Sequence, residues 1–213
     1  MLQFCVRAGL PRPAFLITVF WVFPLVFSIQ VNRTIDDTYG DSATGLQVVY
    51  SVFWNTGQLC PGCAVQPNPA EAFAGSWHDT TSSAIPHNAT MKFVGMARFR
   101  FACRGTSAES VTGTAIWVYG ILVNSGASGV TIYTNASFEL DGYIVGTYHH
   151  IPDPSDDKYL YNVTVFSQHG LSNTEHTLLI NVQSGSETSL FLFDWAIYTY
   201  VTRICGSIIM SMR

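Results

Sequence analysis

The chain has 213 residues, of which 48% are hydrophobic and only 11% are charged. This length and composition predict one domain with a substantial core and exclude a disordered chain. The formal net charge of −4 leaves no basic surface for a phosphate backbone, so nucleic acid is excluded as a partner.

The first 28 residues have the layout of a secretory signal peptide. Arg7 and Arg12 precede an apolar run over residues 13–28, and a polar segment follows it. An uncleaved signal anchor is the alternative reading, although the run is short for a membrane span and Pro24 interrupts it. Both readings predict export, to the medium or to the cell surface.

Acceptor sites for N-glycosylation support export independently. A single Asn-x-Ser/Thr sequon arises easily by chance, whereas several sequons behind a signal peptide are stronger evidence. The predicted glycosylation sites are Asn32, Asn88, Asn135 and Asn162. The sequence therefore predicts an exported glycoprotein.

Short strand signals recur along the chain, separated by Gly, Ser, Asn and Asp. In Val130–Leu140 apolar and polar residues alternate, which places Asn135 on the solvated face of an antiparallel strand. Asp141-Gly142 then predicts a type I′ turn into a strand over Tyr143–Tyr148. The other predicted strands are Leu46–Phe53, Thr114–Val123, Tyr159–Phe166, His176–Val182 and Leu190–Tyr200.

This series of strands predicts an all-β fold, an antiparallel β-sandwich of the jelly-roll kind. The apolar run within Thr114–Val123 indicates a strand covered on both sides or central in its sheet. Alternation directs Ile116 and Val118 into the sandwich and Trp117 and Tyr119 to the opposite face. We expect a loop to cover Trp117 in part.

The pair Cys60-Pro-Gly-Cys63 has the spacing of a redox motif, but no βαβ pattern surrounds it. In an oxidising compartment the two cysteines are expected to form a disulfide with each other. A zinc site would need a second pair of ligands at suitable spacing, so we predict no zinc-type metal site. Cys103 and Cys205 receive no predicted partner.

The stretch Gly75–Thr81, GSWHDTT, sets Trp77, His78 and Asp79 side by side. Trp77 suits the closure of a sandwich end, and Asp79 suits a turn that accepts backbone N–H groups. A structural role is therefore the first interpretation. Ligand binding by Trp54, Trp77, His78 and Asp79 is the second, and catalysis, which needs an identified nucleophile, is the third.

Asp194 lies in the apolar segment LFDWAIYTY, where a carboxylate is costly unless it is hydrogen-bonded or paired. One interpretation is that it accepts from backbone donors. The other is a calcium ion shared with Asp36 or Asp37, which requires the first and last strands to adjoin. No other cofactor is predicted.

Seven motifs in one order carry a resemblance to a family. The motifs are IDDTYGD, VVYSVFWNTG, FAGSWHDTT, GTAIWVYGI, FELDGYIVG, LYNVTVFSQHGLSNTEHTLLI and LFDWAIYTY. Between about Ile35 and Tyr200 the chain resembles the ectodomain of a family from mushroom-forming fungi. Its members are secreted or single-pass membrane proteins. The resemblance implies a surface domain over 35–200 with a fold similar to galactose-binding-domain-like jelly rolls, and it implies no catalytic residue.

Two segments depart from the family pattern. Residues 94–110 are inserted where the family runs almost directly from Lys92-Phe93 to Gly113, and residues 201–213 replace a polar linker and a membrane span. Both segments begin with valine, whose codons start with GT, as introns do. One hypothesis is therefore that both are translated introns; the alternative is a genuine loop insertion and a short tail. Transcript sequencing separates the two.

The leading functional hypothesis is a secreted or cell-surface glycoprotein module, not an enzyme, that binds carbohydrate. Its expected partners are glycans or cell-wall components, with membrane association through the N-terminal segment or a missing C-terminal span. The alternative is a structural ectodomain without a small ligand. A secreted glycan-acting hydrolase comes third, because it needs two carboxylates about 5–10 Å apart across a cleft.

Overall fold

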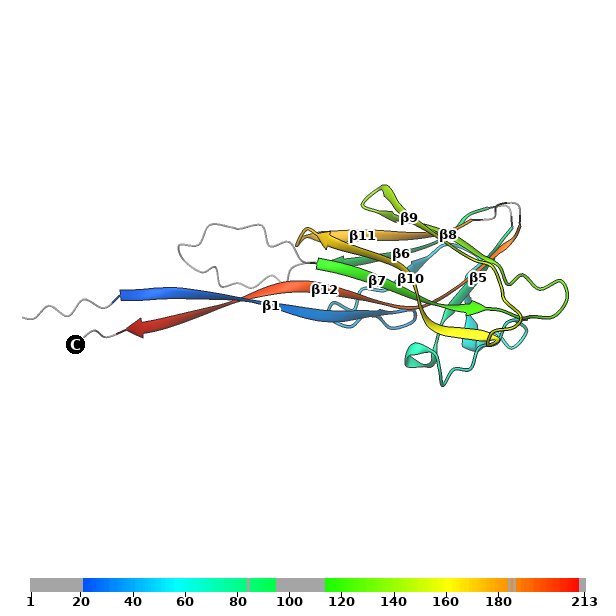
Figure 1. Ribbon diagram of the computed structural model, residues 1–213, viewed down its shortest axis with the longest axis horizontal. Coiled ribbons are helices and arrows are strands. Elements are labelled where there is room, and N and C mark those ends of the chain that lie inside the picture. Colours follow the sequence, from blue (N-terminus) through cyan, green and yellow to red (C-terminus); the bar gives the residue numbers. More distant parts are fainter. Residues whose placement is uncertain (1–20, 84, 95–113, 184, 186, 211–213) are drawn as a thin grey trace, which may run out of the picture.

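Two antiparallel sheets packed together form a β-sandwich, which confirms the predicted fold class. The computed structural model describes residues 21–83, 85–94, 114–183, 185 and 187–210. Figure 1 shows the two sheets as the layers of the sandwich, with the loop-rich end opposite a long ribbon made by β1 and β12.

The larger sheet has seven strands, and its main path runs β10-β7-β12-β1-β2. Off this path, β5 pairs with β12, and β4 pairs with β5. The strands are β1 (Trp21–Asp36), β2 (Gly40–Asp41), β4 (Asn55–Thr56), β5 (His78–Ser82), β7 (Thr114–Val123), β10 (Tyr159–Leu171) and β12 (Ser189–Met210).

The smaller sheet has five strands in the order β3-β6-β11-β8-β9. The strands are β3 (Val49–Tyr50), β6 (His87–Val94), β8 (Thr134–Leu140), β9 (Tyr143–His150) and β11 (Glu175–Val182). Two short 3-10 helices, η1 (Gly57–Leu59) and η2 (Phe73–Gly75), lie in the long connection between β4 and β5.

The main core fills the space between the sheets. Ile116 and Val118 of β7 are completely buried there, as predicted, together with Phe138 of β8 and Ile180 of β11. Burying such side chains contributes about 1.5–3 kcal/mol each, so this layer is the main source of stability.

A second cluster lies on the other face of the larger sheet. Ile121 and Val123 alternate along β7 with Leu122 of the main core, so they point away from the smaller sheet. Residues of the connection between β4 and β5 cover them: Val65, Ala72 and Trp77 belong to the same cluster. We call residues 57–77 the covering loop.

Several predicted elements have the expected position. The strand over Thr114–Val123 has the predicted bounds. Asp141 and Gly142 both have positive φ, 52° and 88°, as a type I′ turn requires. Cys60 and Cys63 form the predicted disulfide.

Two predicted strands are shorter than expected. Leu46–Phe53 reduces to Val49–Tyr50. Beyond the strand, Val52 is exposed rather than packed, and Phe53 has a positive φ of 69°, which a strand does not adopt. Val130–Leu140 begins as a strand only at Thr134, since Val130 and Ile132 pack instead against the second cluster.

The predicted signal and the segments 94–110 and 201–213 are described only in part. Residues 21–28 of the predicted signal pair in β1 with Arg203–Met210 of the C-terminal segment, and residues 1–20 lie outside the described part of the chain. The insertion over 94–110 also lies outside it, apart from Val94 at the end of β6. Within the described residues, no helix has the length and apolarity needed to cross a membrane.

Candidate functional site

The GSWHDTT stretch turns the chain from the covering loop into β5. Ala74 and Gly75 have positive φ values of 51° and 79°, which reverse the chain before the strand. β5 then lies between β4 and β12, with His78 opposite Thr56 on one side and Phe193 on the other. The stretch is therefore fixed from both sides at the loop-rich end of the sandwich.

Asp37, directly after β1, is the centre of a hydrogen-bond network at this end. Its carboxylate accepts from Ser76 Oγ at 2.6 Å, from His78 Nδ1 at 2.7 Å and from Thr38 Oγ1 at 2.9 Å. The residue is 2% exposed, and three donors offset the cost of burying its charge.

The network fixes the orientation and tautomer of His78. Because an ionised carboxylate only accepts, Nδ1 of His78 carries the proton, and Nε2 faces Thr56 Oγ1 at 3.4 Å. The Tyr50 ring stacks on the imidazole with centroids 4.2 Å apart, and the Tyr50 hydroxyl donates to the Asp37 carbonyl at 2.8 Å. Tyr50 thus covers one face of the His78 ring, and Asp37 fixes its Nδ1.

Asp79 points away from this network, as alternation along β5 requires. It is buried and accepts from Asn55 Nδ2 at 3.0 Å, while its second oxygen accepts no hydrogen bond of regular geometry from the described residues. Burial raises the pKa of Asp79, and the Asn55 amide and the Trp77 indole N–H oppose that shift. The carboxylate that orients His78 is thus Asp37 rather than its sequence neighbour.

The two tryptophans predicted as ligand residues lie mostly inside the protein. Trp77 is 1% exposed and belongs to the second cluster, and Trp54 is half-buried, tilted against the Tyr50 ring with centroids 5.0 Å apart. Gly57 lies directly against the Trp77 indole, so that a Cβ there would overlap the ring. Trp77 therefore packs beneath the covering loop on the outer face of the larger sheet.

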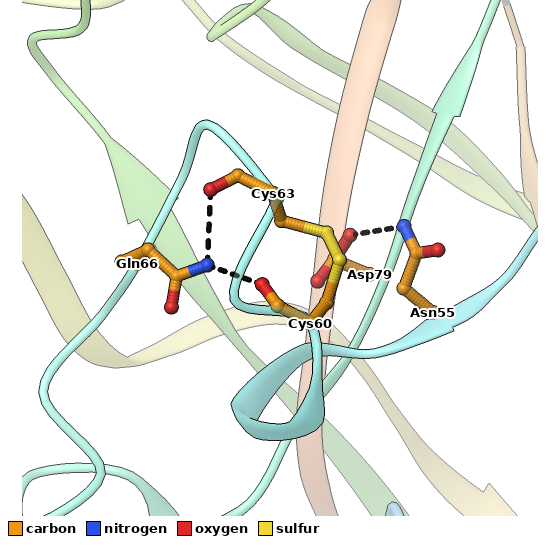
Figure 2. The surroundings of a disulfide bond; sticks show 5 residues. All are labelled: Asn55, Cys60, Cys63, Gln66 and Asp79. Carbon is orange, nitrogen blue, oxygen red and sulfur yellow. Dashed lines mark hydrogen bonds between the residues drawn. A yellow bond between two sulfur atoms is a disulfide. The ribbon is translucent and has the colours of Figure 1, made fainter.

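The disulfide closes a tight turn near the start of the covering loop. Figure 2 shows the side-chain amide of Gln66 between the Cys60 and Cys63 carbonyls, to which its Nε2 donates at 2.6 and 2.9 Å. The loop is also tied to β10, because the hydroxyls of Tyr159 and Tyr161 accept from backbone N–H groups of the loop.

The first and last strands adjoin, as the calcium hypothesis requires. β1 pairs with β12, and the Asp37 N–H donates to the Asp194 carbonyl at 3.3 Å. Asp194 is completely buried, and its Oδ1 accepts from Phe73 N–H at 2.9 Å. Burial raises the pKa of Asp194 to about 7, and the charges of Asp37 and Asp36 contribute to the same shift.

Asp36 takes a different role from the one predicted for a calcium ligand. One oxygen accepts from the N–H groups of Thr38 and Tyr39, an Asx-type turn at the end of β1. Within the described residues, no three His, Cys, Asp or Glu side chains are grouped to hold a metal ion. The calcium ion stays an untested prediction.

A row of aromatic rings beside the covering loop was not predicted from the sequence. Trp195 of β12 lies between Phe73 and Tyr119, with ring centroids 4.6 and 4.4 Å apart and nearly parallel planes. We call these three residues the ring stack. Trp195 and Tyr119 are cross-strand partners on two strands that the sequence predicts. Pairing these two strands in register would have identified the aromatic pair.

Comparisons with known proteins add little to this geometry. The sequence matches no protein-family model and no curated protein. Two solved structures match over 78% of this chain with 11% identity and a TM-score of 0.38; both are the catalytic domain of GH87 alpha-1,3-glucanase in complex with nigerose. The chain spans about a quarter of those chains (27%), and a likeness this weak supports no conclusion about activity.

Proposed function

We propose that the chain is an exported, N-glycosylated β-sandwich module of the cell surface or extracellular space, which binds or displays and does not catalyse. The main support for this proposal is that each predicted glycosylation site lies on the outer surface of the sandwich. Asn32 and Asn162 are exposed. Asn88 and Asn135 are half-buried and precede the buried Ala89 and Ala136, so they lie on the outer face of the smaller sheet, with Oδ1 of Asn88 covered.

The polar network favours a structural role over a catalytic one. Asp37 is buried and all of its donors are internal, so it has no free oxygen directed at solvent-borne substrate. One face of His78 is covered by Tyr50, and the Thr56 hydroxyl is 3.4 Å from its Nε2, at the limit of a hydrogen bond. These contacts support a histidine that holds β1, β4 and β5 together.

Expression of the full chain in a eukaryotic secretory host tests the proposal. We expect the protein in the medium or on the surface, with a mass that falls on removal of N-glycans. Glycopeptide mass spectrometry then reports the occupancy of each sequon. Retention in the cytosol without glycan on any of the four sites would contradict the proposal.

Carbohydrate binding is the second candidate, and one observation favours it. Phe53, next to Trp54, exposes 69% of its surface and has a left-handed φ of 69°, a costly conformation for a bulky residue. The Thr80 hydroxyl donates to the Phe53 carbonyl at 2.9 Å and fixes this turn. An exposed ring held in a strained turn fits contact with a sugar or cell-wall glycan.

A glycan array with the secreted protein tests this candidate. We expect binding that Phe53→Ala reduces at least tenfold, whereas Val52→Ala, the adjacent exposed aliphatic, serves as the matched control and changes it little. If no glycan binds at high micromolar concentration, the purely structural ectodomain is the better description.

A further inference from the structure

The sequon at Asn162 differs from the others in its backbone. It lies in β10, where the pairing with β7 steps from Leu160 to Val163 on one strand but only from Leu122 to Gly120 on the other. This β-bulge leaves Asn162 with a left-handed φ of 54°, a conformation that asparagine tolerates better than most residues. A bulge changes the direction of a side chain, and here it directs the Asn162 side chain over β7 toward β12.

The redirected side chain reaches the ring stack. The Trp195 indole Nε1 donates to Asn162 Oδ1 at 3.1 Å, although β7 lies between their strands. Thr164, the third residue of the sequon, is the cross-strand partner of Tyr119. Both sequon side chains are therefore next to the ring stack on the outer face of the larger sheet.

Glycosylation is compatible with this hydrogen bond. An N-glycan is attached to the amide nitrogen Nδ2, while Oδ1 keeps its acceptor lone pairs. The Trp195 bond then orients the amide, and with it the first sugar, against the rings. Trp195 and Tyr119 are both half-buried, so aromatic surface is left for a sugar to cover.

We propose that the first sugars on Asn162 pack on the edges of Trp195 and Tyr119 and form part of the folded structure. The inference rests on the proposed function, because it requires export and glycosylation. Phe73 and Tyr119 already cover the two faces of the indole, so the sugar contacts ring edges and removes that apolar surface from water.

The other sequons lack such a surface. Asn88 is opposite Asn181 on β11, and Asn181 is in turn opposite Ser137, the third residue of the Asn135 sequon. Asn32 is opposite Thr199 in the ribbon. Asn135 itself is opposite His149 of β9. Glycans at these sites start from amide, hydroxyl and imidazole neighbours and not from a stack of rings, so we expect them to add solubility and little stability.

Thr164→Ala tests the inference, because it removes the sequon and keeps Asn162 with its bond to Trp195. In secreted, glycosylated protein we expect the variant to lower Tm by about 2–5 °C. Thr164→Ser keeps the sequon and is expected to match the parent. Thr90→Ala, which removes the Asn88 site from the smaller sheet, is expected to change Tm by less than about 1 °C.

Two further measurements separate the sugar from the side chains. Trimming every glycan to one sugar is expected to preserve the Tm difference between parent and Thr164→Ala. In the Tyr119→Leu background that difference is expected to fall to the size seen for Thr90→Ala. Parent and Thr164→Ala made without glycosylation are expected to have equal Tm.

Site occupancy distinguishes failure of the inference from failure of the proposed function. Glycan on the other sequons but not on Asn162 would overturn the inference alone. So would an occupied Asn162 whose loss leaves Tm unchanged, or an equal Tm loss in unglycosylated protein. Absence of glycan from all four sites would overturn the proposed function as well.

Discussion

Trp77 and Trp195 lie on the same outer face of the larger sheet and have opposite environments. Trp77 is 1% exposed beneath the covering loop, and its indole N–H makes no hydrogen bond of regular geometry with the described residues, although it interacts with the Asp79 carboxylate. Trp195 is half-buried, and its indole nitrogen donates to Asn162. Phe73 of the covering loop stacks on Trp195. We call the part of this sheet face under the loop, with Trp77, the covered side, and the part beyond it, with Trp195 and Asn162, the open side.

The difference indicates two ways of stabilising an aromatic side chain on a sheet. At Trp77 the stabilisation comes mainly from burying the whole ring, because burial of a large side chain contributes more than one net hydrogen bond. At Trp195 partial burial is combined with a hydrogen bond and two ring contacts. Substitutions at the two positions should therefore differ in size and in kind.

The largest expected effect is that of Trp77→Ala. We expect a loss of about 3–5 kcal/mol in the free energy of unfolding, because the change empties a buried site under the covering loop. Trp195→Ala, the matched change on the open side, should cost about half as much. Urea unfolding monitored by circular dichroism measures both, and equal losses would contradict the comparison.

The next effect is the pH dependence of the free energy of unfolding that Asp194 produces. This residue precedes Trp195 and accepts from the N–H of Phe73 in the covering loop. Its pKa is raised to about 7, above the ordinary value of 3.8, mainly by burial. A raised carboxyl pKa gives stability that is present at low pH and is lost as pH rises through 7. We expect this group to lower the free energy of unfolding by about 2–4 kcal/mol between pH 5 and pH 8.

Asp194→Asn isolates that contribution. Asparagine keeps an oxygen that can accept from Phe73 N–H, but it does not titrate. We expect its stability to be flatter than that of the parent over this pH range, with the two proteins closest at pH 5. Burial lowers the pKa of His150, which acts in the opposite direction in both proteins and cancels in the difference. A parallel pair of pH profiles would contradict the assignment.

The fold was predictable because its signal is local. The apolar run within Thr114–Val123 predicted the strand with its bounds, and Asp141-Gly142 predicted the turn, since both depend on neighbouring residues alone. Leu46–Phe53 shortened to two residues because an apolar pattern does not reveal burial: Val52 and Phe53 are apolar but exposed.

The candidate site was predictable only in its residue types. His78 was singled out, but its partner Asp37 is 41 positions away and meets it only through strand pairing. Asp194 was recognised as a costly carboxylate. Its burial follows from a β-bulge, because Phe193 and Trp195 pair with adjacent residues of β7 and leave Asp194 as the extra one. Bulges depend on register, which one sequence does not specify.

Gly57→Ala tests the covered side with a smaller change. The new methyl group would overlap the Trp77 indole, which has no room to move within the second cluster, so we expect a loss of about 1–3 kcal/mol. Gly62→Ala is the matched control in the same loop, because a Cβ there meets no atom within 4 Å. Equal stability of the two variants would show that the cover over Trp77 is loosely packed.

The smallest effect concerns Asn162 on the open side, where the Trp195 hydrogen bond and the left-handed backbone conformation can be tested separately. In unglycosylated protein, Asn162→Ala loses the Trp195 hydrogen bond and keeps the left-handed φ of 54°, so we expect a cost of about 1–2 kcal/mol. Asn162→Gly loses the same bond, but glycine adopts this φ without a Cβ clash. Its cost should therefore stay below about 1 kcal/mol. Thermal unfolding of the three proteins gives both values, and a glycine variant no more stable than the alanine variant would show that backbone strain at the bulge contributes nothing.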